Sequence, residues 1–279
     1  MKLTKGYYWF LIPSIILFVF TTAYPFISGI NIAFTNWDGI SNTYEYVGLK
    51  NFVDMFHDKN ILKSIKVSLL FALGYTVLNN VLSLFLAVVL QKKFRGNGFF
   101  KTIFFIPMAL SAVLAAFVWG FIDRNILSGI FGHSLLGSPG TVVFGLIIIA
   151  LWCGIGSNIM VYMAGLSNIP QDYYEAASID GATPWGQFIK ITLPLLGPSF
   201  TTCITLTLTS SLREFGIPMS ATGGGPARSS EMISIFIYNN LFSYQKAGYG
   251  QAVSLAFMFV LMALGIGLTR FFRGKEVEQ

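Results

Sequence analysis

Long apolar stretches separated by short polar segments dominate the chain. Six of them hold about 20 predominantly apolar residues, the length that a helix needs to cross the hydrocarbon core of a bilayer. They cover residues 7–32, 67–90, 103–122, 142–165, 193–212 and 252–272. We therefore expect an all-α membrane protein with six transmembrane helices, forming a single domain over residues 1–279. The first stretch is longer than a signal-peptide core and lacks a clear cleavage site, so we expect it to be retained.

Composition supports a membrane protein and excludes a nucleic-acid-binding one. The chain is 54% hydrophobic and 11% charged, whereas roughly a quarter of the residues are charged in soluble domains. Its mean hydropathy is +0.67 and its net charge is +6. No run of closely spaced Lys and Arg forms a face for nucleic acid. The excess of positive charge is better explained by membrane topology.

The basic residues beside the spans predict the orientation, because cytoplasmic flanks retain Lys and Arg. Six spans place the N-terminal flank, the loop between the second and third spans and the C-terminal flank on one side, and we expect that side and both termini to be cytoplasmic. The basic residues of these flanks are Lys2, Lys5, Lys92, Lys93, Arg95, Lys101, Arg270, Arg273 and Lys275. The segment 34–66 opposes this prediction, since it places four lysines on the outer side.

The polar segment 168–194, between the fourth and fifth spans, is predicted to form two short helices. Asn168 is expected to cap the first and Pro170 to lie in its opening turn. Gly181 suits the left-handed conformation that ends a helix. Thr183 and Pro184 read as the cap and first residue of the next helix. Such a projection fits a groove of another protein, although an interfacial helix resting on lipid headgroups is an equal alternative.

Specific residues of this segment resemble the EAA loop of the membrane subunits of ABC importers. The matching residues are Glu175-Ala176-Ala177, Asp180, Gly181, Phe188, Ile191, Leu193 and Pro194. The resemblance implies a coupling helix that docks on an ATPase subunit and moves the membrane helices. It assigns this role to Tyr174, Glu175, Ala176, Ala177, Asp180, Gly181, Ile191, Leu193 and Pro194.

The chain carries no motif for handling ATP itself. Its only Gly-Lys pair, Gly274-Lys275, is followed by Glu276 and lacks the upstream glycine of a P-loop. We expect no cofactor in this chain, with ATP and Mg bound by partner ATPase subunits. The sequence predicts a transport subunit rather than an enzyme.

Three further segments resemble the carbohydrate-uptake branch of these importers. They are Thr222-Gly223-Gly224-Gly225-Pro226, the run from Tyr46 to Phe52, and the run from Ala247 to Ala252. The resemblance implies a di- or oligosaccharide as substrate, with glycerol phosphate as a less favoured solute. It also implies a second permease subunit, two ATP-binding subunits and an extracellular or periplasmic sugar-binding protein, in a bacterial or archaeal cytoplasmic membrane. Gly223, Gly224, Gly225 and Pro226 would face the binding protein, or form a plain turn.

Polar and aromatic residues inside the spans are candidates for the substrate path, because sugars need hydrogen-bonding groups and aromatic faces. They are Asn79, Asn80, Trp152, Asn158, Thr205 and Thr209. Helix packing is the favoured alternative for each, since Thr in membrane helices bonds its own backbone and Asn often joins helices.

An ion-coupled secondary transporter of a small polar solute is the alternative function. Such carriers need an ionisable group near the bilayer centre, whereas the acidic residues here are expected in loops or at span ends. Glu214 is the acidic residue that we expect closest to the membrane. His57 and His133 are expected in separate outer loops, and the sequence predicts no metal site.

Overall fold

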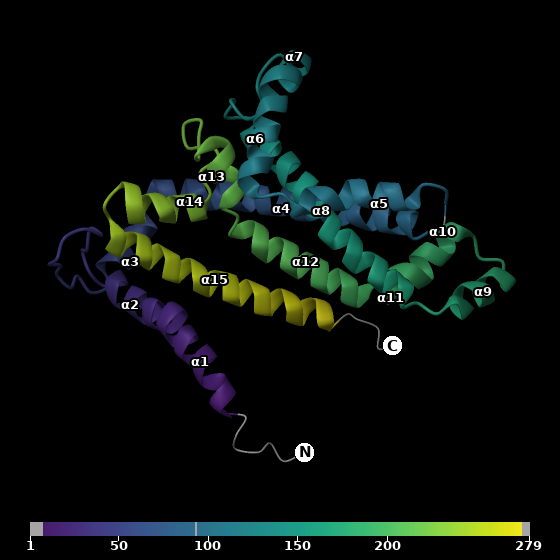
Figure 1. Cartoon of the computed structure of the whole chain (residues 1–279), viewed down its shortest axis with the longest axis horizontal. Helices are drawn as coiled ribbons and strands as arrows, with labels where there is room; N and C mark the ends of the chain where they lie inside the picture. Colours follow the sequence, from purple (N-terminus) through teal and green to yellow (C-terminus); the bar gives the residue numbers. More distant parts are fainter. Residues whose placement is uncertain (1–7, 93, 275–279) are drawn as a thin grey trace. The chain divides into compact units, whose positions relative to one another are not determined.

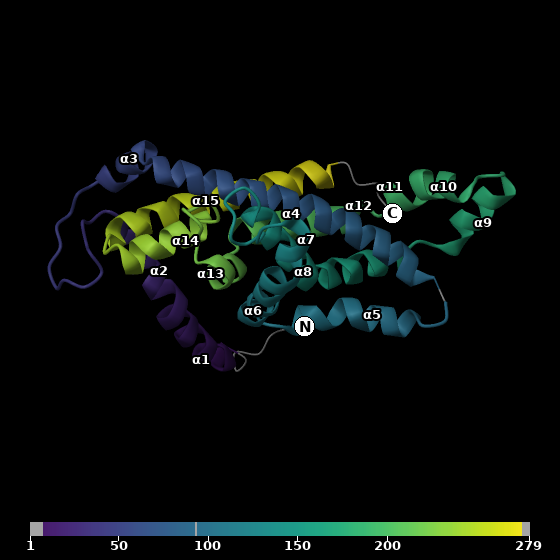
Figure 2. The same ribbon diagram turned by 90° about the horizontal axis from the view of Figure 1, so that it is seen from above.

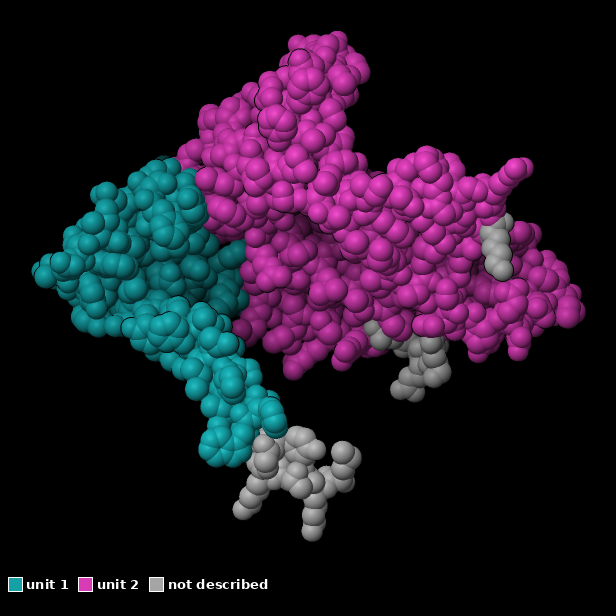
Figure 3. All heavy atoms as spheres, viewed as in Figure 1, with its two compact units in different colours: residues 1–61, 236–259 teal, residues 62–235, 260–279 magenta. Residues whose placement is uncertain are grey.

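The computed structural model describes residues 8–92 and 94–274 of the chain. These residues are mainly helical and contain no β-strand, apart from one isolated antiparallel bridge between Thr35 and Tyr46. The predicted all-α class is confirmed. The chain forms two compact units, which are residues 1–61 with 236–259 (unit 1) and residues 62–235 with 260–279 (unit 2) (Figure 3). Four basic residues used for orientation, Lys2, Lys5, Lys93 and Lys275, lie outside the described residues.

Fifteen α-helices are found in the described part of the chain (Figures 1 and 2). They are α1 (Tyr8–Phe18), α2 (Tyr24–Ala33), α3 (Lys50–His57), α4 (Lys59–Gln91), α5 (Asn97–Phe105), α6 (Ala112–Ile122), α7 (Ser128–Phe131), α8 (Val142–Ser167), α9 (Gln171–Ile179), α10 (Pro184–Gln187), α11 (Leu193–Leu195), α12 (Gly197–Leu212), α13 (Gly216–Thr222), α14 (Ile233–Tyr238) and α15 (Ala247–Arg273). Short π-helical segments at Val19–Ala23, Asp123–Leu127, Phe188–Thr192 and Asn239–Ser243 connect consecutive helices, and Ile106–Ala109 is a 3₁₀ turn.

Four of the six predicted spans are confirmed as helices long and apolar enough to cross a membrane. They correspond to Trp9–Ala33, Lys59–Gln91, Val142–Ser167 and Ala247–Arg273. Pro25 does not end the first of them, because the π-helical segment at Val19–Ala23 precedes it and the helix continues to Ala33. The second span begins eight residues earlier than the apolar stretch, at Lys59.

The prediction of one continuous span over residues 103–122 is wrong. The α5 helix ends at Phe105, and α6 starts only after the extended Leu110 and Ser111. Pro107 has no N–H for a helical hydrogen bond, and the Ser111 side chain caps α6 by accepting from the Leu114 N–H at 3.3 Å. The apolar helix is Ala112–Phe131 instead.

The span predicted at residues 193–212 is bent. The helical runs Pro184–Leu195 and Gly197–Leu212 are long and apolar enough to cross a membrane only when they are taken together. The angle between them is 66°. Pro194 and Pro198 flank the break, and each removes a backbone donor. With this bent pair counted as one span, the described residues hold six candidate spans.

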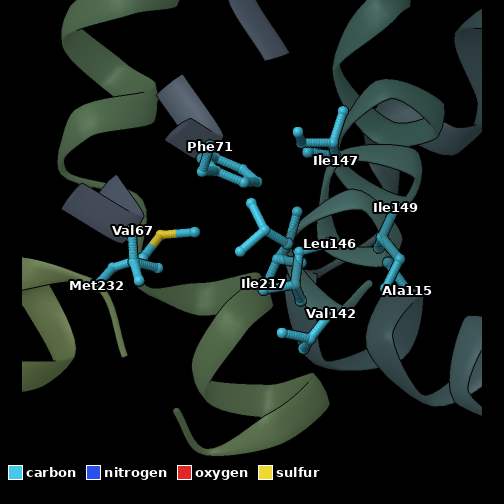
Figure 4. Close-up of a cluster of buried hydrophobic side chains, with 11 residues drawn as sticks. Val67, Phe71, Ala115, Val142, Leu146, Ile147, Ile149, Ile217 and Met232 are labelled. Atoms are coloured by element: carbon cyan, nitrogen blue, oxygen red, sulfur yellow. The ribbon is translucent and has the colours of Figure 1, made fainter. Parts of the chain in front are cut away.

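Unit 2 has two buried apolar clusters, each joining helices that are distant in sequence. The first joins α4, α6, α8 and α13, with Phe71, Leu146 and Ile217 among its members (Figure 4). The second joins the end of α4 with α8 and α12 around Ile159 and Leu196. Unit 1 has a smaller cluster of its own, in which α2 meets the first part of α15.

Candidate functional site

The segment between α8 and α12 forms a projection at one end of unit 2, built from α9 and α10 (Figures 1 and 2). We call residues 170–188 the knob. The prediction that Asn168 caps α9 is wrong, because Asn168 ends α8 and Pro170 occupies the N-cap position of α9. Pro170 has extended backbone, at φ −59° and ψ 138°. It therefore separates the two helices instead of lying in the opening turn.

The turn of the knob follows the local signals in its sequence. Gly181 has a φ of +78°, a left-handed conformation that other residues adopt only at a cost. The Ala182 N–H bonds the Ala177 carbonyl across this turn at 2.9 Å. Thr183 caps α10 by accepting from the Gly186 N–H at 3.2 Å, and Pro184 is the first residue of that helix. The predicted helix, sharp turn and second helix are confirmed.

Side-chain hydrogen bonds connect the two arms of the knob to each other and to the bent span. The Tyr174 hydroxyl and the Thr192 Oγ1 are 2.9 Å apart. The Gln187 amide donates to the Ser178 Oγ at 2.8 Å and to the Tyr174 carbonyl at 3.3 Å. Tyr174 and Ile191 also pack against the second apolar cluster. These contacts connect α9 directly to the segment that leads into α12.

The outer surface of the knob exposes large apolar side chains. Ile179 is 88% exposed, Trp185 71% and Tyr173 54%. The predicted coupling residues Glu175 and Ala176 are exposed as well. The same holds for three other predicted coupling residues, Asp180, Gly181 and Pro194. The remaining four are half-buried: Tyr174, Ala177, Ile191 and Leu193. Exposed apolar groups gathered on a projection indicate a surface that is covered by another molecule.

Three of the substrate-path candidates form buried hydrogen bonds between helices of unit 2. The Asn158 Nδ2 donates to the Asn79 Oδ1 at 2.7 Å and to the Thr207 Oγ1 at 2.9 Å, joining α4, α8 and α12. Asn80 accepts from the Tyr162 hydroxyl at 2.7 Å. Each Asn side chain thus has a hydrogen-bond partner on another helix. This is the helix-packing role that the sequence analysis favoured for these residues.

The other three candidates have different surroundings. Trp152 is half-buried and makes an edge contact with Trp119, with ring centroids 6.0 Å apart. Thr209 donates to the Thr205 carbonyl at 2.7 Å. The Thr205 Oγ1 is buried and has no hydrogen-bond partner among the described residues. Other atoms of Thr205 line a cavity of about 280 Å³ between α12 and the end of α15.

The glycine-rich loop follows α13 and has an irregular backbone. Gly223 and Gly224 have φ values of +59° and +87°, and the Gly225-Pro226 peptide bond is cis. Beside them, Arg228 pairs with the buried Glu231 at 2.5 Å. The Lys63 Nζ donates to the Ala227 carbonyl at 2.8 Å. The loop is held to α4, and its predicted role toward a binding protein stays a prediction.

Sequence reasoning missed the role of Asp123. It was expected at the end of a span, but it lies inside the helical run Ala112–Phe131 and is 3% exposed. Its carboxylate accepts from the Ser134 hydroxyl at 2.5 Å and from the Leu135 and Leu136 N–H groups at 2.9 and 3.2 Å. These three hydrogen bonds give the buried carboxylate its partners, and they hold the loop that follows α7 against Asp123. No local sequence signal indicated this arrangement.

Comparison with known proteins gives a consistent result. The family model for binding-protein-dependent transport system inner membrane components matches residues 79–274. The chain is 32% identical to a probable starch degradation products transport system permease of Thermoanaerobacterium thermosulfurigenes, over 98% of this chain and 96% of the relative. It is 30% identical to a multiple sugar-binding transport system permease of Streptococcus mutans, over 93% and 92%.

Two further proteins are similar. An sn-glycerol-3-phosphate transport system permease of Brucella abortus is 32% identical, over 95% of this chain and 92% of the relative. A chain of a bacterial ABC transporter involved in the import of the acidic polysaccharide alginate has the same fold. Its crystal structure gives a TM-score of 0.82 at 22% identity, covering 95% of this chain and 94% of that one.

Proposed function

The chain belongs to the family of binding-protein-dependent transport system inner membrane components, and on this premise we propose that it is the permease subunit of a sugar importer. The printed functions of two similar relatives, for starch degradation products and for multiple sugars, support a di- or oligosaccharide. The glycerol phosphate permease among the relatives makes a phosphorylated polyol the second candidate.

The knob is the part of the chain that contacts the ATP-hydrolysing subunits. ATP and Mg are bound by two partner ATPase subunits, and α9 docks on one of them through its exposed face. The hydrogen bond between Tyr174 and Thr192 supports this role, because it connects α9 directly to the bent span. Closure of the ATPase pair then shifts the membrane helices between inward and outward states. This single contact carries the mechanical part of the proposal.

The remaining partners and the orientation follow from the same assignment. A second permease subunit completes the translocation path, and a binding protein delivers the sugar at the opposite face, toward Gly223, Gly224, Gly225 and Pro226. The knob and both termini then lie in the cytoplasm of a bacterium or archaeon. The basic residues that follow α4, Lys92 and Arg95, and those that end α15, Arg270 and Arg273, support this orientation, whereas the lysines of segment 34–66 oppose it.

The proposal is tested by uptake into vesicles. The purified permease, its partner permease, the ATPase and the binding protein are reconstituted, and entry of labelled maltose, maltotriose, sucrose, raffinose and glycerol 3-phosphate is measured. We expect uptake of at least one sugar that requires both ATP and the binding protein. Uptake driven by an ion gradient in the absence of ATP would instead establish a secondary transporter.

Thr205 offers a test of the substrate path, because its hydroxyl has no hydrogen-bond partner among the residues that the structure describes. We expect Thr205→Val to raise the KM for the transported sugar about five- to tenfold, the loss of one hydrogen bond of about 1 kcal/mol or slightly more. Stability should change little, since no intramolecular hydrogen bond is lost. Thr209→Val is the matched control, because that hydroxyl already donates to the Thr205 carbonyl. Equal KM values for both variants and the unaltered protein would remove Thr205 from the path.

A further inference from the structure

Unit 1 contains a pocket that lies outside the apolar parts of the spans. Its volume is about 450 Å³, within the range of roughly 300–1,000 Å³ found for small-molecule sites. The lining comes from residues 36–47, from α3 and from residues 245–249. The first span ends at Ala33 and the second begins at Lys59, so the first two of these segments lie between spans. The third overlaps the start of the span Ala247–Arg273, so the pocket lies at the ends of the spans.

The lining combines aromatic rings with hydrogen-bonding groups of both kinds. Trp37 and Tyr249 supply the rings. Two ammonium groups and two carboxylates also line the pocket, and their charges cancel; these belong to Lys50, Lys246, Asp54 and Asp58. A simple ion gains no net attraction from such a set. A neutral polyhydroxyl compound finds donors, acceptors and flat apolar faces together.

Several of these polar side chains have no ion-pair or hydrogen-bond partner for one of their charged or polar atoms among the described residues. Lys50, Lys246 and Asp54 form no ion pair with any residue that the structure describes. Asn51 is only 8% exposed, and its Nδ2 donates to the Ala33 and Thr35 carbonyls at 2.9 and 2.8 Å. No described residue donates to its Oδ1. A ligand hydroxyl that enters the pocket would give this oxygen a hydrogen-bond donor.

The two carboxylates of the pocket have different surroundings. Asp58 accepts from the Tyr249 hydroxyl at 3.0 Å and from the Asn60 N–H at 2.8 Å, so it holds the tyrosine ring in place. Asp54 lies four residues earlier, within α3, and has no such contacts within the described chain. On the opposite wall, Gln245 has a φ of +53°. Left-handed backbone at a non-glycine residue is a strain that gathers at binding sites.

We propose that this pocket binds one ring of a neutral saccharide. Trp37 and Tyr249 contact the ring faces, while Asp54 and the Asn51 Oδ1 accept hydrogen bonds from its hydroxyls. Lys50 and Lys246 donate to the ring oxygens. This inference rests on the proposed function, whose orientation places the pocket at the outer face.

The test measures sugar binding by the complete reconstituted transporter, without ATP and without the binding protein. The probe is the sugar that the uptake assay identifies among maltose, maltotriose, sucrose and raffinose, and its Kd is obtained by saturation-transfer difference NMR. We expect Asp54→Ala to raise this Kd about ten- to hundredfold, as for the loss of a hydrogen bond to a charged group. Glu45→Ala is the control, because Glu45 is an acidic residue of the segment before α3 and lies outside the pocket lining.

Each other outcome is informative. An unchanged Kd for Asp54→Ala, or absence of binding by the unaltered transporter, overturns the inference while uptake still supports the proposed function. An unchanged Kd combined with weaker association of the binding protein would make the pocket a protein-docking site, which also overturns it. Uptake of none of the four sugars would refute the proposed function, and the inference with it.

Discussion

Gly181→Asp is expected to leave the protein inserted in the membrane and to reduce ATP-driven uptake at least about tenfold. Gly181 has a φ of +78°, and a Cβ there would meet nothing within 4 Å. Asp is among the residues that tolerate this backbone best, so the chain itself accommodates the change. An unpaired charge buried in a docked surface costs several kcal/mol. The loss therefore arises at the ATPase, and it is measured as uptake together with ATP hydrolysis in reconstituted vesicles.

Gly132→Asp is the matched control for this variant. Gly132 has a φ of +74° and similarly open surroundings, but it follows α7 and is not part of the knob. Gly132→Asp therefore introduces the same backbone strain at a position that does not dock on the ATPase subunit. Normal uptake by Gly181→Asp would count heavily against the coupling role. Equal losses in both variants would attribute the effect to backbone strain alone.

Gly154→Ala is expected to lower the stability of the isolated chain by about 1–3 kcal/mol, the usual cost of overpacking. A Cβ at Gly154 would overlap the Tyr75 hydroxyl of α4. The ring cannot move away freely, since it stacks on Phe71 at 5.8 Å and its hydroxyl accepts from Asn79 at 3.1 Å. The measurement is the free energy of unfolding in a bicelle or detergent micelle.

The double variant identifies the atom responsible for this loss. In a Tyr75→Phe background the overlapping oxygen is gone, and we expect Gly154→Ala to cost less than half as much as in the unaltered chain. Gly267→Ala in α15 is the control, because a Cβ there meets nothing within 4 Å. The same cost in both backgrounds would show that Tyr75 does not limit the approach of α4 and α8.

Local patterns were enough for the elements whose determinants lie within a few residues. Four of the spans follow from uninterrupted apolar length, because each helix satisfies its backbone hydrogen bonds internally. The turn of the knob follows from Gly181, and the start of α10 from Thr183 and Pro184. The cap of α9 was misassigned to Asn168, since that residue continues the end of α8 and Pro170 takes the cap position.

Two spans show where local pattern is insufficient. The 103–122 stretch is predominantly apolar, yet it divides at Pro107 and Ser111, and the segment before the break packs against α8. The bend at Leu196 is similar, since its fully buried side chain belongs to the second apolar cluster. Hydropathy measures how strongly a segment prefers lipid to water. It carries no information about where a helix breaks or in which direction it bends.

The sequence by itself determined that this protein is an all-α membrane protein with an exposed helical knob, and through its motifs to which family it belongs. Only the tertiary structure decided which polar side chains meet. Asn158 reaches partners 79 and 49 positions away in the chain, and Asp123 is satisfied by a loop that follows it. Apolar length and turn residues act over a few positions, whereas the partner of a buried polar group depends on how distant helices pack.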